Sequence, residues 1–206
     1  MTTTYQVNEV FDSIQGEGVH AGVPATFIRL QGCTVGCEWC DTQYTWGKGG
    51  TRMTGEEVAN LVLQSHVVIT GGEPTIYNLD FLMAEIWLQH SGAYIQLETS
   101  GQNDFKGKYF PSHITWSPKA ALDFQCAKGL INFIREVKFV VDTDLTTNNV
   151  DSALEQVGGN IHISFMPEGT PPTREMILRA MDYATVYANR HYVRFTHRLQ
   201  YLLEVK

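Results

Sequence analysis

The sequence contains no long hydrophobic run, and it offers no segment that would direct export. No uninterrupted stretch of about 18 apolar residues occurs, and residues 1–4 are not a charged segment followed by an apolar one. These features exclude a membrane span and a recognisable export signal. We therefore expect a cytoplasmic protein that makes no membrane contact.

Positive charge is scarce as well. The 206 residues include 15 Lys and Arg against 22 Asp and Glu, for a formal net charge of −7. A protein that grips nucleic acid needs a concentrated basic face, so we expect no direct contact with nucleic acid. Small anions can still bind at local sites.

Internal repeats, low-complexity tracts and Pro/Ser-rich linkers are also missing. The chain is 43% hydrophobic and 18% charged, which is ordinary for a folded globular protein. Its length suits one domain with a single core. We therefore expect one domain over residues 1–206.

Short apolar runs alternate with longer amphipathic windows along the chain. Runs rich in Ile, Val and Phe predict strands at residues 25–30, 66–70, 93–98, 114–117, 136–141 and 160–165. Helices are predicted after an N-cap at Thr54, over residues 78–90, and over residues 172–189 with Pro172 in the first turn. This alternation predicts an α/β fold with a mostly parallel sheet, either open or curled into a barrel.

The four cysteines are distributed unevenly. Cys33, Cys37 and Cys40 have the spacing C-x3-C-x2-C directly after a predicted strand, whereas Cys126 stands alone and is expected to be a partly buried structural thiol. In a reducing compartment a disulfide framework is not expected, so the three clustered thiolates indicate a metal centre. A cubane iron-sulfur cluster held by three thiolates keeps one iron open for a ligand that is not protein. Two alternatives stay open, a zinc site completed by Cys126 or a histidine and a set of buried thiols.

Polar, turn-forming segments follow several predicted strands. They are Gly71-Gly72-Glu73-Pro74, Glu98-Thr99-Ser100-Gly101 and Ser117-Pro118-Lys119. Ligand sites in α/β sheets lie beyond the carboxyl ends of the strands, so these segments and the cysteine loop are expected on one rim.

Two basic residues lie within predicted strands. Arg29 interrupts an apolar run and needs an anionic partner, either a structural carboxylate such as Glu17 or Asp12, or the carboxylate of a substrate. Lys138 is expected to alternate outward from its strand.

At this point the motifs match known sequences. The C-x3-C-x2-C spacing with Trp39 before the last cysteine, followed by Gly71-Gly72-Glu73-Pro74, resembles the radical S-adenosylmethionine superfamily. A wider set of segments resembles the 7-carboxy-7-deazaguanine synthase family within it. These segments are residues 11–18, 22–25, 27–33, 39–42, 67–74, 98–101 and 117–119, with Thr196-His197-Arg198 near the C-terminus.

The resemblance implies an incomplete, modified (βα) barrel of the radical S-adenosylmethionine type and a homodimer. It implies a carbon-nitrogen lyase that contracts the ring of 6-carboxy-5,6,7,8-tetrahydropterin to give 7-carboxy-7-deazaguanine and ammonia, a step in queuosine-type 7-deazapurine biosynthesis. It further implies that one electron, from a donor such as a flavodoxin, cleaves S-adenosylmethionine to a 5′-deoxyadenosyl radical. On this expectation no side chain is the principal nucleophile or general base.

The resemblance also implies roles for individual residues. A 4Fe-4S cluster is expected on Cys33, Cys37 and Cys40, and Mg²⁺ on Thr42. S-adenosylmethionine is expected to contact Trp39, Asp41, Gly72, Glu73, Ser100, Ser117, Pro118 and Lys119. The pterin substrate is expected to contact Ile14, Gln15, Gly16, Glu17, Arg29 and Thr70.

Two other functions fit parts of the pattern. A glycyl-radical activating enzyme shares the cysteine spacing but acts on a protein backbone, and a zinc-stabilised binding module performs no catalysis. Iron and sulfide content separates the zinc module from both radical enzymes.

Overall fold

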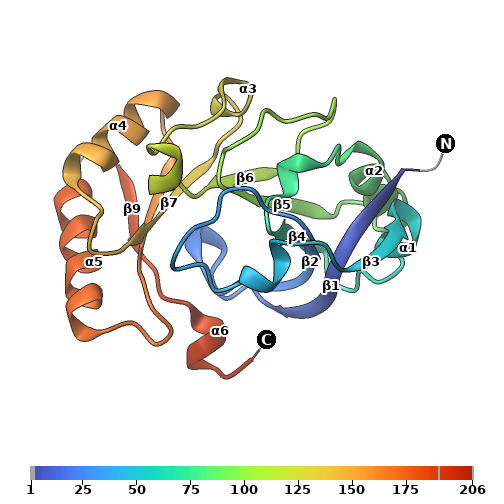
Figure 1. The fold of residues 1–206 in the computed structure, drawn as a ribbon, viewed down its shortest axis with the longest axis horizontal. Helices are drawn as coiled ribbons and strands as arrows, with labels where there is room; N and C mark the ends of the chain where they lie inside the picture. The colour runs from blue at the N-terminus through green and yellow to red at the C-terminus, as the bar shows by residue number, and fades with distance from the viewer. Residues whose placement is uncertain (1–2, 190, 206) are drawn as a thin grey trace.

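One mixed sheet of nine strands organises the part of the chain described by the computed structural model, residues 3–189 and 191–205 (Figure 1). The strand order is β3-β1-β2-β4-β5-β6-β7-β8-β9. The strands are β1 (Thr4–Ile14), β2 (Pro24–Leu30), β3 (Thr51–Thr54), β4 (His66–Gly71), β5 (Tyr94–Thr99), β6 (His113–Trp116), β7 (Glu136–Val141), β8 (His162–Pro167) and β9 (Tyr192–Phe195).

The sheet is parallel from β2 to β9, and β1 is antiparallel to both of its neighbours, β2 and β3. Its two outer strands, β3 and β9, are not paired with each other within the described residues. The predicted α/β fold with mostly parallel strands is therefore confirmed, as an open sheet.

Helices cover the outside of the curved sheet, except that the last one, Leu199–Leu202, lies at the cavity described below (Figure 1). The α-helices are α1 (Gly55–Ala59), α2 (Asp80–Gln89), α3 (Lys128–Ile131), α4 (Thr147–Val157), α5 (Arg174–Tyr187) and α6 (Leu199–Leu202). Short 3-10 turns are η1 (Gly18–His20), η2 (Gln43–Thr45), η3 (Pro74–Ile76) and η4 (Ala120–Leu122). Helix α1 packs on α2 at one end of the sheet, and α5 packs on β8 and β9 at the other.

The helix starts follow local capping chemistry. The Thr54 hydroxyl accepts from Glu57 N at 3.1 Å while Glu57 Oε2 accepts from Thr54 N at 2.7 Å, so the predicted cap of α1 is confirmed. The prediction that Pro172 lies in the first turn of α5 is wrong. The Thr173 hydroxyl accepts from Met176 N at 3.2 Å and caps a helix that begins at Arg174.

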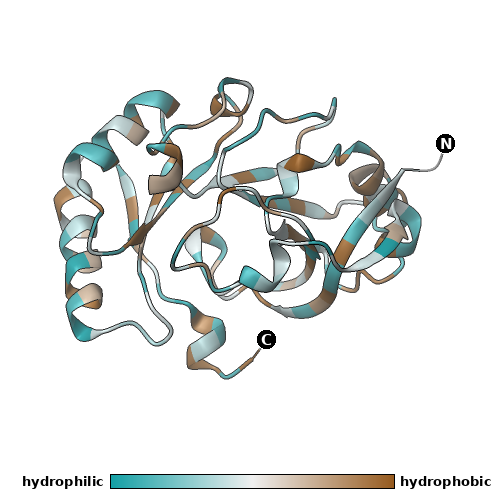
Figure 2. Ribbon diagram, in the orientation of Figure 1, coloured by the Kyte–Doolittle hydropathy of each residue, from teal (hydrophilic) through white to brown (hydrophobic). Residues whose placement is uncertain are grey.

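The core lies between the sheet and the helices that pack on it. Large side chains of the strands are fully buried there, and Phe139 and Phe165 stack with ring centroids 5.3 Å apart. In Figure 2 apolar residues recur along the strands, while polar residues are frequent on the outer helices. Cys126 is buried in this core, and burial raises the pKa of its thiol to about 12, in keeping with the expected structural role.

Within the described residues, no helix combines the length and the apolar character that a membrane crossing requires.

Candidate active site

A cavity of about 410 Å³ opens at the carboxyl ends of the parallel strands. The strand exits predicted to form one rim do meet there. Of the residues expected to hold the cluster, S-adenosylmethionine, Mg²⁺ or substrate, Glu73 and Pro118 are not on the cavity wall. The others line it: Ile14, Gln15, Gly16, Glu17, Arg29, Cys33, Cys37, Trp39, Cys40, Asp41, Thr42, Thr70, Gly72, Ser100, Ser117 and Lys119.

The cysteine loop follows β2 and folds over one side of the cavity. Gly32 N donates to Thr45 O at 2.7 Å and Cys33 N donates to Trp46 O at 3.4 Å, which ties the start of the loop to η2. Cys33, Cys37 and Cys40 are half-buried free thiols on the wall, and burial raises the pKa of Cys37.

This donor set fits an iron-sulfur cluster. Three thiols from one loop face a shared space, and thiolates are the protein ligands of such clusters. Among the described side chains, no three of His, Cys, Asp or Glu are arranged to hold a single metal ion.

The glycines after β4 allow close packing against the cysteine loop. A Cβ at Gly72 would collide with Gly32 O and lie 2.9 Å from Cys33 Cβ. Gly72 N donates to Leu30 O at 3.0 Å, and Gly71 has φ 138°, a conformation that favours glycine. The paired glycines therefore let the end of β4 lie directly against the exit of β2.

Glu73 lies behind the wall and ties two strand exits together. Its carboxylate accepts from Thr99 Oγ1 at 2.6 Å and from Ser100 N at 2.8 Å, and also from the Ser100 hydroxyl. Only 1% of Glu73 is exposed. Its carboxylate orients Ser100, which does line the cavity.

A cationic and aromatic wall stands beside the cysteines. Lys119 Nζ donates to Ser117 Oγ at 2.6 Å and lies 4.8 Å from the centroid of the Trp39 ring. Burial lowers the pKa of Lys119.

Lys138 lies on the cavity wall between two carboxylates, so the expectation that it points outward is wrong. Its Nζ is 2.7 Å from Glu17 Oε2 and 2.7 Å from Glu98 Oε2. Strand β7 is buried along its whole length, so alternation does not bring its side chains to solvent. The sequence indicated Glu98 only as part of a motif at a strand exit, and it did not predict the ion pairs of Lys138 with Glu17 and Glu98.

The charges of this cluster shift one another's pKa values. Burial opposes ionisation of Glu17, but the positive charges of Lys138 and Arg198 outweigh it and lower the pKa of Glu17 to about 2. Burial also disfavours charge on Lys138, yet Glu17 and Glu98 raise its pKa. For Glu98 burial dominates and raises the pKa.

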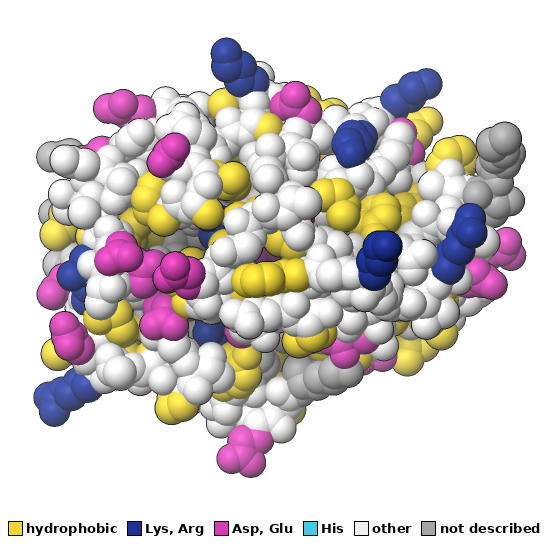
Figure 3. Space-filling model, viewed as in Figure 1, with side chains coloured by type: hydrophobic (Ala, Val, Ile, Leu, Met, Phe, Trp, Pro, Cys, Tyr) yellow, Lys and Arg dark blue, Asp and Glu magenta, His cyan; other side chains and the backbone are white. Residues whose placement is uncertain are grey.

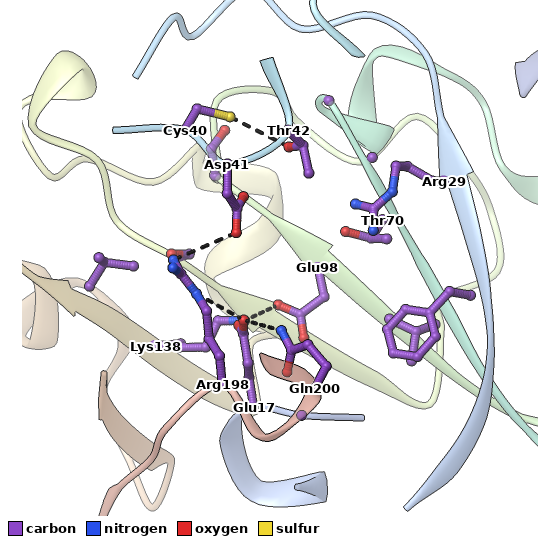
Figure 4. A pocket seen from close by; sticks show the side chains of 18 of the residues that line it. Glu17, Arg29, Cys40, Asp41, Thr42, Thr70, Glu98, Lys138, Arg198 and Gln200 are labelled. Carbon is purple, nitrogen blue, oxygen red and sulfur yellow. Dashed lines mark hydrogen bonds and ion pairs between the residues drawn. The ribbon is translucent and has the colours of Figure 1, made fainter. Parts of the chain in front are cut away.

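The C-terminal segment supplies a second cation, Arg198, to the Glu17 carboxylate (Figure 4). Arg198 Nε lies 3.4 Å from Glu17 Oε1 and its Nη2 lies 3.7 Å from Asp41 Oδ2. Gln200 Nε2 donates to Glu17 Oε1 at 3.3 Å, and Leu199 N donates to Gly16 O at 3.1 Å. The resemblance of residues 196–198 to the family's tail was the available sequence signal for this wall.

Arg29 pairs with a carboxylate that the sequence did not suggest. Its Nε donates to Glu9 Oε1 at 2.8 Å, whereas Asp12 accepts from Thr26 Oγ1 at 2.5 Å. Glu9 stands directly opposite Arg29 in the antiparallel pairing of β1 with β2. Both expected structural partners, Glu17 and Asp12, are thus replaced by Glu9.

Two further polar groups complete the wall. Thr42 Oγ1 lies 3.4 Å from Cys40 Sγ, and Gln15 Nε2 donates to Glu98 Oε1 at 3.3 Å. The cavity therefore has a thiol side, formed by the cysteine loop, and a charged side, formed by Glu17, Glu98 and Lys138.

Charge on the outer surface differs from charge in the cavity. On the face drawn in Figure 3, Lys and Arg side chains stand at separate points, and several Asp and Glu side chains gather left of centre. This face presents no continuous basic patch of the kind that nucleic-acid binding requires.

The chain is similar in sequence to known enzymes. A scan against models of protein families finds no match. A 7-carboxy-7-deazaguanine synthase from Aquifex aeolicus is 34% identical over 155 residues, covering 70% of this chain and 68% of that protein. The synthase of the same name from Buchnera aphidicola is 34% identical over 182 residues, covering 77% and 81%.

A solved structure shares the fold. The crystal structure of QueE from Escherichia coli superposes with a TM-score of 0.74 at 28% sequence identity, covering 94% of this chain and 95% of that one. The shared fold is that of a radical S-adenosylmethionine enzyme. From these likenesses the chain belongs to the 7-carboxy-7-deazaguanine synthase family.

Proposed function

We propose that the protein is a lyase that contracts the ring of 6-carboxy-5,6,7,8-tetrahydropterin to 7-carboxy-7-deazaguanine with release of ammonia, a step of queuosine-type biosynthesis. The names of its relatives support this reaction. The observation that carries it is the two-sided cavity, in which three thiols face Glu17, Lys138 and Arg29 across a space of about 410 Å³. A redox cofactor and a charged small molecule fit such a site together.

Cys33, Cys37 and Cys40 would hold the 4Fe-4S cluster. With S-adenosylmethionine bound to it, the cluster supplies the reductive bond cleavage that starts the radical chemistry. The chain's own residues bind and orient that cofactor. This set comprises Trp39, Asp41, Gly72, Ser100, Ser117 and Lys119 on the wall, with Pro118 beside them and Glu73 acting through Ser100.

The charged side of the cavity would bind the pterin. Glu17 remains ionised because its pKa is about 2, so its carboxylate can accept from N–H groups of the pterin ring. Arg29 offers a cation to the substrate carboxylate, and Thr70 and Gln15 offer further polar groups. Ile14 and Gly16 supply backbone beside them.

Mg²⁺ would bind next to the substrate carboxylate through the Thr42 hydroxyl. Hard oxygen ligands suit this ion, and Mg²⁺ usually keeps several waters, so one protein oxygen and the substrate suffice. The position of Thr42 on the cavity wall supports the assignment.

We also propose how the protein works in the cell. Its 206 residues act as one radical S-adenosylmethionine domain, in line with the single sheet, and pair as a homodimer in the cytoplasm. A small one-electron carrier such as a flavodoxin delivers the electron. The modified base enters nucleic acid only after later steps, so this protein binds no nucleic acid itself.

Anaerobic incubation of reconstituted protein with S-adenosylmethionine, magnesium, a reductant and 6-carboxytetrahydropterin tests the reaction. We expect 7-carboxy-7-deazaguanine and ammonia in equal amounts. Cleavage of S-adenosylmethionine without deazaguanine product would redirect the assignment to another radical enzyme, such as a glycyl-radical activating enzyme. A colourless protein with zinc in place of iron and sulfide would leave the zinc-stabilised binding module.

A further inference from the structure

A polar and aromatic layer closes the amino ends of the parallel strands, at the opposite end from the cavity. The first residues of four neighbouring strands form it: His66 of β4, Tyr94 of β5, His113 of β6 and Glu136 of β7. The ring of His20, at the end of η1, lies 4.9 Å from His66, 5.2 Å from Tyr94 and 4.6 Å from His113, measured between ring centroids. The turn Gly18–His20 therefore plugs this end of the sheet.

Glu136 carries the buried charge of this layer. None of it is exposed, and its carboxylate accepts from Ser164 Oγ at 2.5 Å, from Thr115 Oγ1 at 3.2 Å and from Val19 N at 3.1 Å. His113 Nε2 lies 3.5 Å from Oε2. A carboxylate removed from water needs such donors, and one of them is the backbone of the turn.

The turn lies directly on this carboxylate. A Cβ built on Gly18 would lie 2.6 Å from Glu136 Oε1 and 2.8 Å from Oε2, too close for any side chain. Gly18 also has φ 68°, which favours glycine. The contact therefore leaves the turn little freedom to shift towards β7.

Strand β7 also holds Glu17, the residue that precedes the turn. Lys138 lies two residues beyond Glu136 on the same face of the strand and bonds the Glu17 carboxylate at 2.7 Å. Glu136 thus fixes the backbone at Val19 while Lys138 fixes the side chain of Glu17. These two contacts together hold residues 17–19 against β7.

We propose that Glu136 is a positioning residue for the reaction. It does not line the cavity, and it acts by anchoring the turn Gly18–His20 so that Gln15, Gly16 and Glu17 present their polar groups to the pterin. This inference rests on the proposed function, because it assigns the segment 15–17 to substrate binding. Removing the anchor weakens pterin binding and leaves the cysteine side of the cavity intact.

The test compares Glu136→Ala with Glu136→Gln. The alanine variant loses the acceptor for Val19 N, whereas the glutamine variant keeps an oxygen that can accept it. For Glu136→Ala we expect the KM for the pterin to rise about tenfold, the scale of one lost charge-assisted hydrogen bond, with the affinity for S-adenosylmethionine unchanged. We expect Glu136→Gln to restore the KM to within about threefold of the wild-type value.

Ser164→Ala and Thr115→Val are the matched controls. Each removes another donor to the same carboxylate but keeps the bond to Val19. Both should cost stability without raising the KM for the pterin. If they raise it as much as Glu136→Ala does, Glu136 has only a structural role and the proposal is wrong.

Amide hydrogen exchange separates failure of the anchor from failure of the proposed function. We expect Glu136→Ala to speed exchange across residues 15–20 about tenfold or more relative to Ser164→Ala, and this readout needs no turnover. Unchanged exchange would overturn the anchor even in an active enzyme. Faster exchange in a protein whose wild type forms no deazaguanine would leave the anchor standing and the reaction wrong. Should Glu136→Ala not fold, Gly18→Ala displaces the same turn with Glu136 in place and is judged by the same two readouts.

Discussion

Lys138 Nζ lies 2.7 Å from Glu98 Oε2 on the wall of the cavity, and the same ammonium group also bonds Glu17. One cation therefore serves two buried carboxylates that approach from different strand exits. The positive charges of Lys138 and Arg198 lower the pKa of Glu17 to about 2, so this carboxylate stays ionised. The arrangement also makes Lys138 the group on which the charged side of the cavity depends.

Replacing this lysine should destabilise the protein and change the pKa of Glu17. Lys138→Met leaves Glu17 and Glu98 facing each other without the cation between them, and we expect the free energy of unfolding to fall by about 3 kcal/mol. Denaturant unfolding at neutral pH measures this change. We also expect the pKa of Glu17 to rise, because the positive charge that lowers it most is gone.

The exposed Lys48 provides the control for that variant. Lys48→Met removes the same charge from the surface and should change stability by less than about 0.5 kcal/mol. The double variant Lys138→Met with Glu98→Gln should recover part of the loss, since one of the two uncompensated carboxylates is neutral. Equal losses for the single and double variants would contradict the shared-cation arrangement.

Lys138 also shows where reasoning from the sequence fails. The strand itself was predicted with its observed bounds, residues 136–141, because its apolar run is unbroken. The outward direction of Lys138 assumed that one face of the strand meets water. In this curved sheet the other face borders a buried polar interior, and no local pattern records that.

Long-range pairing accounts for the other missed residues. Arg29 was recognised as needing an anion, but its partner Glu9 is set by the antiparallel register of β1 with β2, which no local pattern records. Arg198 reaches Glu17 from the far end of the chain. The cysteine loop was predictable because its three cysteines lie within eight residues of one another in the sequence.

His20 makes stability depend on pH. Burial and the neighbouring His113, His66 and His162 together lower its pKa to about 4, while Glu136 opposes the shift. The unfolded chain, with an ordinary histidine pKa near 6.5, binds more protons between pH 6.5 and pH 4. Stability from this group is therefore full above about pH 6.5 and falls as the pH drops towards 4.

Unfolding free energies measured from pH 7 to pH 4.5 check this dependence. We expect His20→Phe to lose on the order of 2 kcal/mol less than the wild type across that range, because phenylalanine keeps the ring packing without a proton to bind. His191→Phe is the control, as that ring lies outside the layer around His20. Parallel pH curves for the wild type and His20→Phe would contradict the assignment.

The clustered cysteines and Cys126 should differ in their effect on the iron content of the protein. Cys40→Ala removes a thiol from the cavity wall, and we expect the reconstituted protein to lose most of its iron and sulfide. Cys126→Ala removes a thiol whose pKa of about 12 keeps it protonated in the core, and we expect full iron content with a loss of about 1 kcal/mol in stability. Iron loss in Cys126→Ala would instead favour a ligand role for that thiol.

Thr42 tests the magnesium assignment. Thr42→Ala should weaken the dependence of product formation on Mg²⁺, raising the half-maximal concentration about tenfold, whereas Thr42→Ser keeps the hydroxyl and should behave as the wild type. Thr42 O also accepts from Thr45 Oγ1 at 2.8 Å, so Thr45→Val reports the effect of disturbing the loop alone. An unchanged magnesium response in Thr42→Ala would remove Thr42 from the metal site.

Arg29 is expected to select the carboxylate of the substrate. Glu9 holds the guanidinium through Nε at 2.8 Å, and the Arg29 guanidinium carbon lies 5.6 Å from the centroid of the Phe11 ring, so the cation is fixed on the cavity wall before any ligand binds. Loss of a bidentate cation should cost about two orders of magnitude in affinity for 6-carboxytetrahydropterin in Arg29→Met. A pterin with a hydroxymethyl group at C6 should lose much less, because it offers no charge to the arginine. Equilibrium binding of the two pterins to the wild type and to Arg29→Met measures these losses of affinity. Equal losses for both pterins would show that Arg29 has a structural role through its pair with Glu9 and does not recognise the substrate carboxylate.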